Sequence, residues 1–187
     1  MKFLFTLLLF TNIFVCAAQT NFYKGFIGKH PIQLITKVHK NGFARAVYSY
    51  DKYDTPINIS GRLSNDTLTL LQKNEEDKVI AKFQFNPSTL DSTHLIGTWS
   101  KQGKRKKRQV SLTKFAYITD YEETSFDSLE IMQNESTDKH YFKLLTTEYL
   151  EIIAVRVYEK RTDKLIQDIP VKCQYIGYNN LSVGDFN

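Results

Sequence analysis

The sequence predicts an all-β protein, in which a small antiparallel barrel or sandwich is followed by a second, incomplete β-hairpin module. Short runs of alternating apolar and polar residues succeed one another from 20 to 115, separated by turn residues, and none has a helical period. In addition, Gly25, Gly61 and Gly97 recur 36 residues apart, each between two apolar residues of one strand face. A glycine inside a strand marks a bend or a close approach of another segment, so these three predict closure of the sheet.

The first 18 residues have the pattern of a cleaved secretory signal. Lys2 precedes an apolar run that is too short for a stable membrane span, and a small-residue cleavage site follows it. Cys16 opens a lipoprotein alternative, but Val15 stands where that signal normally has Gly, Ala or Ser. The pattern therefore favours a periplasmic or secreted mature chain that begins near Gln19, with a lipoprotein as the less favoured alternative.

The mature chain has about 169 residues, which is enough for one domain or two small ones. Loss of Lys2 lowers the formal net charge from +5 to +4. Only Cys173 remains after removal of the signal, so an intrachain disulfide is excluded. A hydrophobic core must therefore supply the stability.

Residues 19–117 contain the runs that predict the barrel. The expected strands cover 23–28, 32–38, 43–50, 57–63, 67–70, 78–85, 95–99 and 109–113. Asn41-Gly42 is the strongest hairpin signal among the turns, and Asn65-Asp66 marks another.

Residues 118–187 are expected to form an acidic connector and a truncated β module. The stretch 118–140 carries seven carboxylates, and its apolar residues are irregularly spaced. This pattern is compatible with either one helical turn or a strand. A strand is expected over 139–146. Two alternating runs, 153–158 and 165–169, then flank a polar turn and predict a hairpin.

The last residues of the sequence have the beginning of a calcium-binding loop. Asp185 and Asn187 match positions one and three of Asp-x-Asp/Asn-x-Asp/Asn-Gly, in which side-chain oxygens at alternating positions surround the ion. Two side-chain ligands fall short of the six to eight oxygens that calcium takes. We therefore expect no tight calcium binding, and calcium as a cofactor only if the loop were complete.

Residues 155–187 resemble a family of bacterial periplasmic proteins through Thr162-Asp163-Lys164-Leu165-Ile166-Gln167 and the later Gly184-Asp185-Phe186-Asn187. Family members bind calcium and inhibit lysozyme-like peptidoglycan hydrolases, some as immunity proteins against secreted effectors. Asp163 stands where the family usually has Gly, and the second half of the calcium loop is missing. The 19–117 region loosely resembles small secreted β-barrels, which implies an architecture and not a function.

Two groups of residues are candidates for binding. Tyr48, Tyr50, Tyr53 and Trp99 could line a pocket at a barrel mouth, although aromatic residues more often cover the open end of a small barrel. The most basic run contains Lys104, Arg105, Lys106, Lys107 and Arg108. We interpret this run as a solvated turn, with an acidic partner protein as the target if it binds. Export argues against nucleic acid.

No catalytic motif is recognisable in the sequence, and the four histidines lack metal-ligand spacing. The sequence thus favours an exported, non-enzymatic binding protein. By resemblance, its function is inhibition of, or immunity against, a peptidoglycan hydrolase. The alternatives are a small-ligand carrier that uses Tyr48, Tyr50 and Trp99, and a truncated structural protein without activity.

Overall fold

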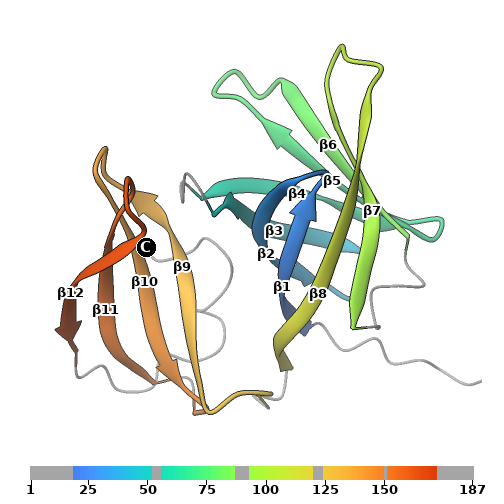
Figure 1. The fold of residues 1–187 in the computed structure, drawn as a ribbon. Helices are drawn as coiled ribbons and strands as arrows, with labels where there is room; N and C mark the ends of the chain where they lie inside the picture. The colour runs from blue at the N-terminus through green and yellow to red at the C-terminus, as the bar shows by residue number, and fades with distance from the viewer. Residues whose placement is uncertain (1–18, 52–55, 87–92, 120–123, 150, 172–187) are drawn as a thin grey trace, which may run out of the picture.

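The computed structural model describes residues 19–51, 56–86, 93–119, 124–149 and 151–171, and every regular element in them is a β-strand (Figure 1). The all-β prediction is confirmed, as is the order of a barrel followed by a smaller β module. The predicted signal 1–18, Tyr53, and the pair Asp185 and Asn187 lie outside the described residues.

The first eight strands form a closed antiparallel barrel in which each strand pairs with its neighbours along the chain. They are β1 (Gln19–Ile27), β2 (His30–Val38), β3 (Phe43–Tyr50), β4 (Ile57–Ser64), β5 (Thr67–Lys73), β6 (Val79–Phe85), β7 (His94–Lys101) and β8 (Lys107–Thr119). Pairing of β1 with β8 completes the ring. Since every connection reverses direction, the connections after β1, β3, β5 and β7 share one end of the barrel, here called the upper rim (Figure 1).

The alternation in the sequence gives the barrel its interior. In β6, for example, Ala81, Phe83 and Phe85 are buried while Lys82 and Gln84 between them are partly exposed. Side chains from all eight strands fill the interior: Tyr23, Ile27, Ile32, Leu34, Ala44, Ala46, Tyr48, Ile59, Leu68, Leu70, Phe83, Phe85, Leu95, Val110 and Leu112. The barrel therefore encloses a packed core.

The three spaced glycines lie where the backbone of a neighbouring strand leaves no room for a side chain. A Cβ built on Gly25, Gly61 or Gly97 would sit 2.1, 1.9 or 2.3 Å from the carbonyl oxygen of Ser111, Thr69 or Gln84, respectively. Real Cβ atoms are not found this close to a backbone oxygen. Any side chain at these positions would push two paired strands apart. The close approach of the neighbouring backbone therefore explains why each of the three positions is a glycine.

The hairpin signals also correspond to turns. Asn65 and Asp66 both have positive φ, 44° and 55°, as the mirror-image turn of a two-residue hairpin requires. Gly42, with φ at 80°, ends the connection between β2 and β3.

The second module is a four-stranded antiparallel sheet in the order β12-β11-β10-β9. Its strands are β9 (Ser128–Ser136), β10 (His140–Thr147), β11 (Ile152–Glu159) and β12 (Lys164–Pro170). The predicted hairpin corresponds to β11 and β12. The acidic stretch supplies β9, so the strand alternative was right for that segment.

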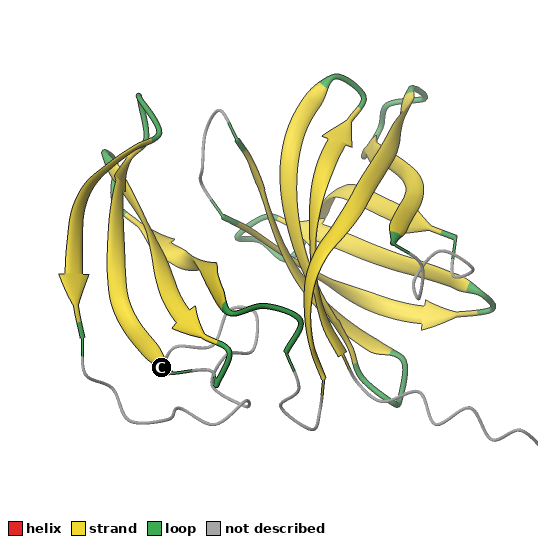
Figure 2. Ribbon diagram, turned by 60° about the horizontal axis from the view of Figure 1, so that its bottom comes forward, coloured by secondary structure: helices red, strands yellow, loops and turns green. Residues whose placement is uncertain are grey.

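A shared hydrophobic cluster joins the barrel to the second sheet. It contains outward-facing Phe22 and Ile35 of the barrel, Ala116 and Ile118 of β8, and Leu129, Ile131 and Met132 of β9. β8 runs on to Thr119, past the predicted boundary at 117, which carries the chain to this cluster. Figures 1 and 2 accordingly show the sheet beside the barrel, and Figure 1 shows β9 as its nearest strand.

Candidate functional site

Four of the predicted binding residues meet at the upper rim of the barrel. Tyr48 and Tyr50 come from β3, with ring centroids 5.6 Å apart and edge-on. Trp99 of β7 is paired with Arg108 of β8, and the Arg108 guanidinium carbon lies 5.6 Å from the centre of the indole ring. Strands distant in sequence thus bring the predicted aromatic residues to one place.

Tyr48 forms the top of the packed core. Its side chain is 1% exposed, its ring meets Phe83 edge-on at 5.1 Å, and its hydroxyl donates to Gln72 Oε1 at 2.9 Å. Burial raises the pKa of Tyr48, and neighbouring Tyr50 raises it further. The hydroxyl therefore stays protonated at neutral pH and serves as a donor that closes the barrel.

Tyr50 and Trp99 lie above this layer and are only partly buried. The His30 ring meets Tyr50 edge-on at 6.2 Å. Burial raises the pKa of Tyr50, against the lowering effects of Tyr48 and the Arg108 charge. The Trp99 Nε1 atom is buried and has no hydrogen-bond partner among the described residues, although it lies close enough to Tyr48 to lower the pKa of that phenol.

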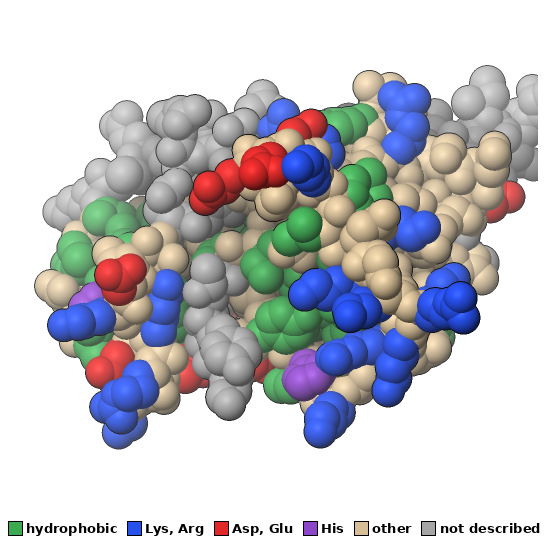
Figure 3. Space-filling model, turned by 90° about the horizontal axis from the view of Figure 1, so that it is seen from above, with side chains coloured by type: hydrophobic (Ala, Val, Ile, Leu, Met, Phe, Trp, Pro, Cys, Tyr) green, Lys and Arg blue, Asp and Glu red, His purple; other side chains and the backbone are tan. Residues whose placement is uncertain are grey.

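The β7–β8 hairpin carries the basic run beside this rim. Residues 101–109 are all exposed, and Gly103, with φ at 73°, lies at the tip. Lys107 and Arg108 pair with Ser100 and Trp99, so they belong to β8 and not to the turn. Seen from above, Lys and Arg side chains gather over the barrel around hydrophobic ones (Figure 3).

The cations at positions 104–107 are not neutralised within the described part of the chain. No described carboxylate forms an ion pair with Lys104, Arg105, Lys106 or Lys107. The β7–β8 hairpin thus presents concentrated positive charge next to Trp99.

A second polar cluster lies on the sheet β9–β12, around Glu130, and the sequence analysis did not predict it. Glu130 Oε1 accepts hydrogen bonds from Arg156 Nη1 and the Tyr158 hydroxyl, both at 2.6 Å, and Lys143 Nζ lies 3.4 Å from Oε2. Burial alone would raise the pKa of Glu130, but the bonds from Tyr158 and Arg156 and the charges of Lys143 and Arg156 outweigh it and lower the pKa.

The Glu130 cluster is best explained as structural, because its charges satisfy one another. Its members come from three strands, and the partners of Glu130 lie 13 to 28 residues from it in sequence. Only the register of β9, β10 and β11 brings them together. In the barrel, burial raises the pKa of the Asp51 carboxyl; among the nearby charges, Lys24 and Lys143 lower this pKa and Asp163 raises it.

The described residues contain no group of three or more His, Cys, Asp or Glu placed to hold a metal ion. Within the same residues, no helix is long and apolar enough to cross a membrane. Searches of protein-family models, curated proteins and solved structures find no match to this chain. The resemblance of residues 155–187 to hydrolase inhibitors therefore stays a prediction.

Proposed function

We propose that the protein is an exported, non-enzymatic inhibitor of a peptidoglycan hydrolase, and that it acts by inserting the β7–β8 hairpin turn into the enzyme's cleft. The class of partner is proposed from the resemblance of residues 155–187 to hydrolase inhibitors. The β7–β8 hairpin is proposed as the binding element because of its position and charge in the structure. The observation that carries the proposal is the exposed positive charge of Lys104, Arg105 and Lys106, which no carboxylate among the described residues pairs with, on a hairpin that projects from a packed barrel.

Charge and shape both favour this partner. Glycoside hydrolases carry a pair of carboxyl groups in a cleft, and a narrow cationic turn complements such a site. Electrostatic complementarity chiefly sets specificity and association rate, so apolar anchors are needed for affinity. Trp99 belongs to the same hairpin and contacts Arg108, and Tyr50 lies at the same rim beside Tyr48; both would supply aromatic anchors of the type that dominates interface energetics.

The carrier alternative receives less support. Fifteen buried side chains occupy the barrel interior, and Tyr48 closes it beneath the rim through its bond to Gln72. A ligand inside the barrel would have to displace part of this core. The third alternative, a protein without binding activity, is an outcome of the experiment below.

The test is inhibition of peptidoglycan clearing by a panel of lysozyme-like hydrolases, using the chain from Gln19. We expect saturable inhibition by one or more of them. Combined Lys104→Glu, Arg105→Glu and Lys106→Glu should weaken inhibition by about a hundredfold, as expected when interface charges meet repulsion.

The matched control makes the same change in charge on the second sheet, with Lys139→Glu, Arg161→Glu and Lys164→Glu, and should leave inhibition intact. Equal loss of inhibition in both triple variants would show that inhibition depends on the net charge of the protein and not on the β7–β8 hairpin turn. No inhibition across the panel would contradict the proposed function.

A further inference from the structure

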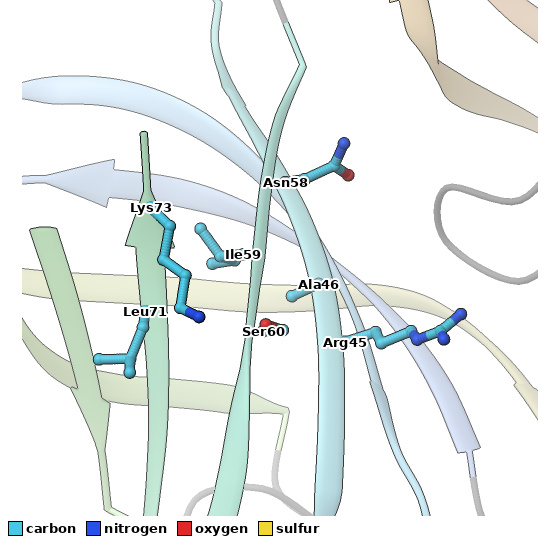
Figure 4. A pocket seen from close by; sticks show the side chains of 7 residues that line it. All are labelled: Arg45, Ala46, Asn58, Ile59, Ser60, Leu71 and Lys73. Carbon is cyan, nitrogen blue, oxygen red and sulfur yellow. The ribbon is translucent and has the colours of Figure 1, made fainter. Parts of the chain in front are cut away.

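The barrel wall opens between β4 and β5. Their ladder ends at Ser60 opposite Leu71, yet both strands continue: Ile57 still pairs with Tyr48 of β3, and Lys73 still pairs with Val79 of β6. A cavity of about 330 Å³ lies at this opening (Figure 4). Its lining residues are Arg45, Ala46, Asn58, Ile59, Ser60, Leu71 and Lys73.

The opening combines an apolar base with polar edges. Ala46 and Ile59, 2% and 4% exposed, form the base, and Leu71 adds an apolar wall. Figure 4 shows the Lys73 ammonium and the Ile59 side chain between β5 and β4. Arg45 points away from them and lies over the Phe43 ring, so Lys73 is the cation of the opening.

Below the opening, the Tyr48–Gln72 hydrogen bond links β3 directly to β5 inside the barrel. This bond spans the stretch where β4 and β5 are no longer paired. Ala46 and Ile59 belong both to the packed core and to the cavity lining, so a ligand there would rest against the edge of the core. The opening lies at the upper ends of β4 and β5, and β6 separates it from the β7–β8 hairpin of the proposed function. A ligand there would therefore be tested independently of the hairpin contacts.

We propose that this opening binds a small monocarboxylate with a short apolar chain. Its volume is at the lower end of the range for small-molecule sites. One cation suits a single carboxylate, and Asn58 and Ser60 add polar groups at the edge. The apolar chain would cover Ile59 and Leu71.

Lys73 already forms an ion pair with Asp77, so a carboxylate ligand would compete with the Asp77 side chain. Its Nζ lies 2.8 Å from Asp77 Oδ1, but the Asp77 side chain is 83% exposed. Exposed ion pairs contribute little, so a carboxylate ligand can replace Asp77. Asp77 has φ at 60°, a conformation that asparagine tolerates well, which makes Asp77→Asn a mild change in the backbone.

The test is titration of the ¹⁵N-labelled protein with hexanoate, followed by amide chemical shifts. We expect saturable shifts centred on 57–60 and 71–73. Lys73→Gln should weaken binding about tenfold, as loss of a hydrogen bond to a charged group does. Asp77→Asn should tighten binding about twofold to fivefold by removing the competing carboxylate. Lys82→Gln, which removes the same charge from β6, should have no effect.

Two further probes separate charge from apolar contact. Hexan-1-ol and inorganic phosphate should each bind at least about tenfold more weakly than hexanoate, because each lacks one of the two contacts. Equal binding of either probe would overturn the proposal. So would hexanoate shifts elsewhere in the protein, or an Asp77→Asn variant that binds hexanoate more weakly.

Discussion

At the scale of single residues, Gly97 shows how one absent side chain determines the path of a strand. A Cβ at this position would lie 2.3 Å from Gln84 O and 2.6 Å from Phe85 Cδ1. The first of these atoms is backbone and is held in the ladder between β6 and β7. Relief by a side-chain rotation is therefore excluded, and the strands themselves would have to move.

We expect Gly97→Val to lower the free energy of unfolding by about 1–3 kcal/mol, since the branched side chain must push β6 away. Urea denaturation monitored by Trp99 fluorescence measures this. Ile96→Val is the control, because Ile96 is exposed on the same strand and should change stability little. An unchanged midpoint for Gly97→Val would mean that the close approach carries no strain.

At the scale of elements, the Glu130 cluster connects three of the four strands in the second sheet. Glu130 of β9 bonds to Arg156 and Tyr158 of β11 across β10. Tyr158 also stacks on Tyr141 at 5.0 Å, and Lys143 lies 4.4 Å from the centre of the Tyr158 ring. Carboxylate, cation and aromatic ring thus hold the strands in one register.

The lowered pKa of Glu130 makes this sheet sensitive to acid. A carboxyl whose pKa falls on folding stabilises the folded state above its ordinary value of 4.5, and that stability disappears as the pH falls through the lower, folded value. Between pH 6 and pH 3, the wild type should therefore lose more stability than Glu130→Gln, in which this group does not titrate.

Denaturation midpoints measured at several pH values test this expectation, with Glu75→Gln as the control. Glu75 is exposed and forms no ion pair with a described residue. Its variant should follow the wild-type pH profile. A Glu130→Gln profile parallel to the wild type would contradict the role given to the Glu130 carboxylate.

At the scale of the whole molecule, the cluster of Phe22, Ile118 and Met132 with its neighbours couples the barrel to the second sheet. Ile118 is 1% exposed although it lies near the end of β8, beyond the residues that fill the barrel. Its burial comes from contacts with the outer face of β1 and β2 and with β9. The second sheet therefore depends on the barrel for part of its core.

We expect Ile118→Ala to destabilise the protein by about 2–4 kcal/mol, with the largest effect on the second sheet. Amide hydrogen exchange reports the two parts separately. Exchange in β9 and β10 should accelerate more in Ile118→Ala than in Leu112→Ala, which removes a side chain from the barrel interior alone. Similar acceleration in both variants would show that the cluster does not hold the sheet to the barrel.

Much of the fold follows from local sequence patterns. Alternation along 19–117 predicts eight strands, and Asn41-Gly42 and Asn65-Asp66 mark turns that the structure contains. These features depend on neighbours in sequence, because a strand's two faces and a tight turn's φ angles are local properties. For the candidate site, Tyr48, Tyr50 and Trp99 were considered as residues at a barrel mouth, and they do lie at one end of the barrel. Arg108 was expected in a solvated turn and lies instead in β8, paired with Trp99.

The sequence by itself thus determined the strands, their turns and the aromatic and basic residues that the barrel presents at its rim. Tertiary structure decided which strands pair and along how much of their length they stay paired. The opening between β4 and β5 and the cluster around Glu130 both depend on register between strands, and no local pattern specifies where a ladder ends. In the barrel, closure and packing of the core set the register, because burying one face of every strand at once leaves a single consistent pairing.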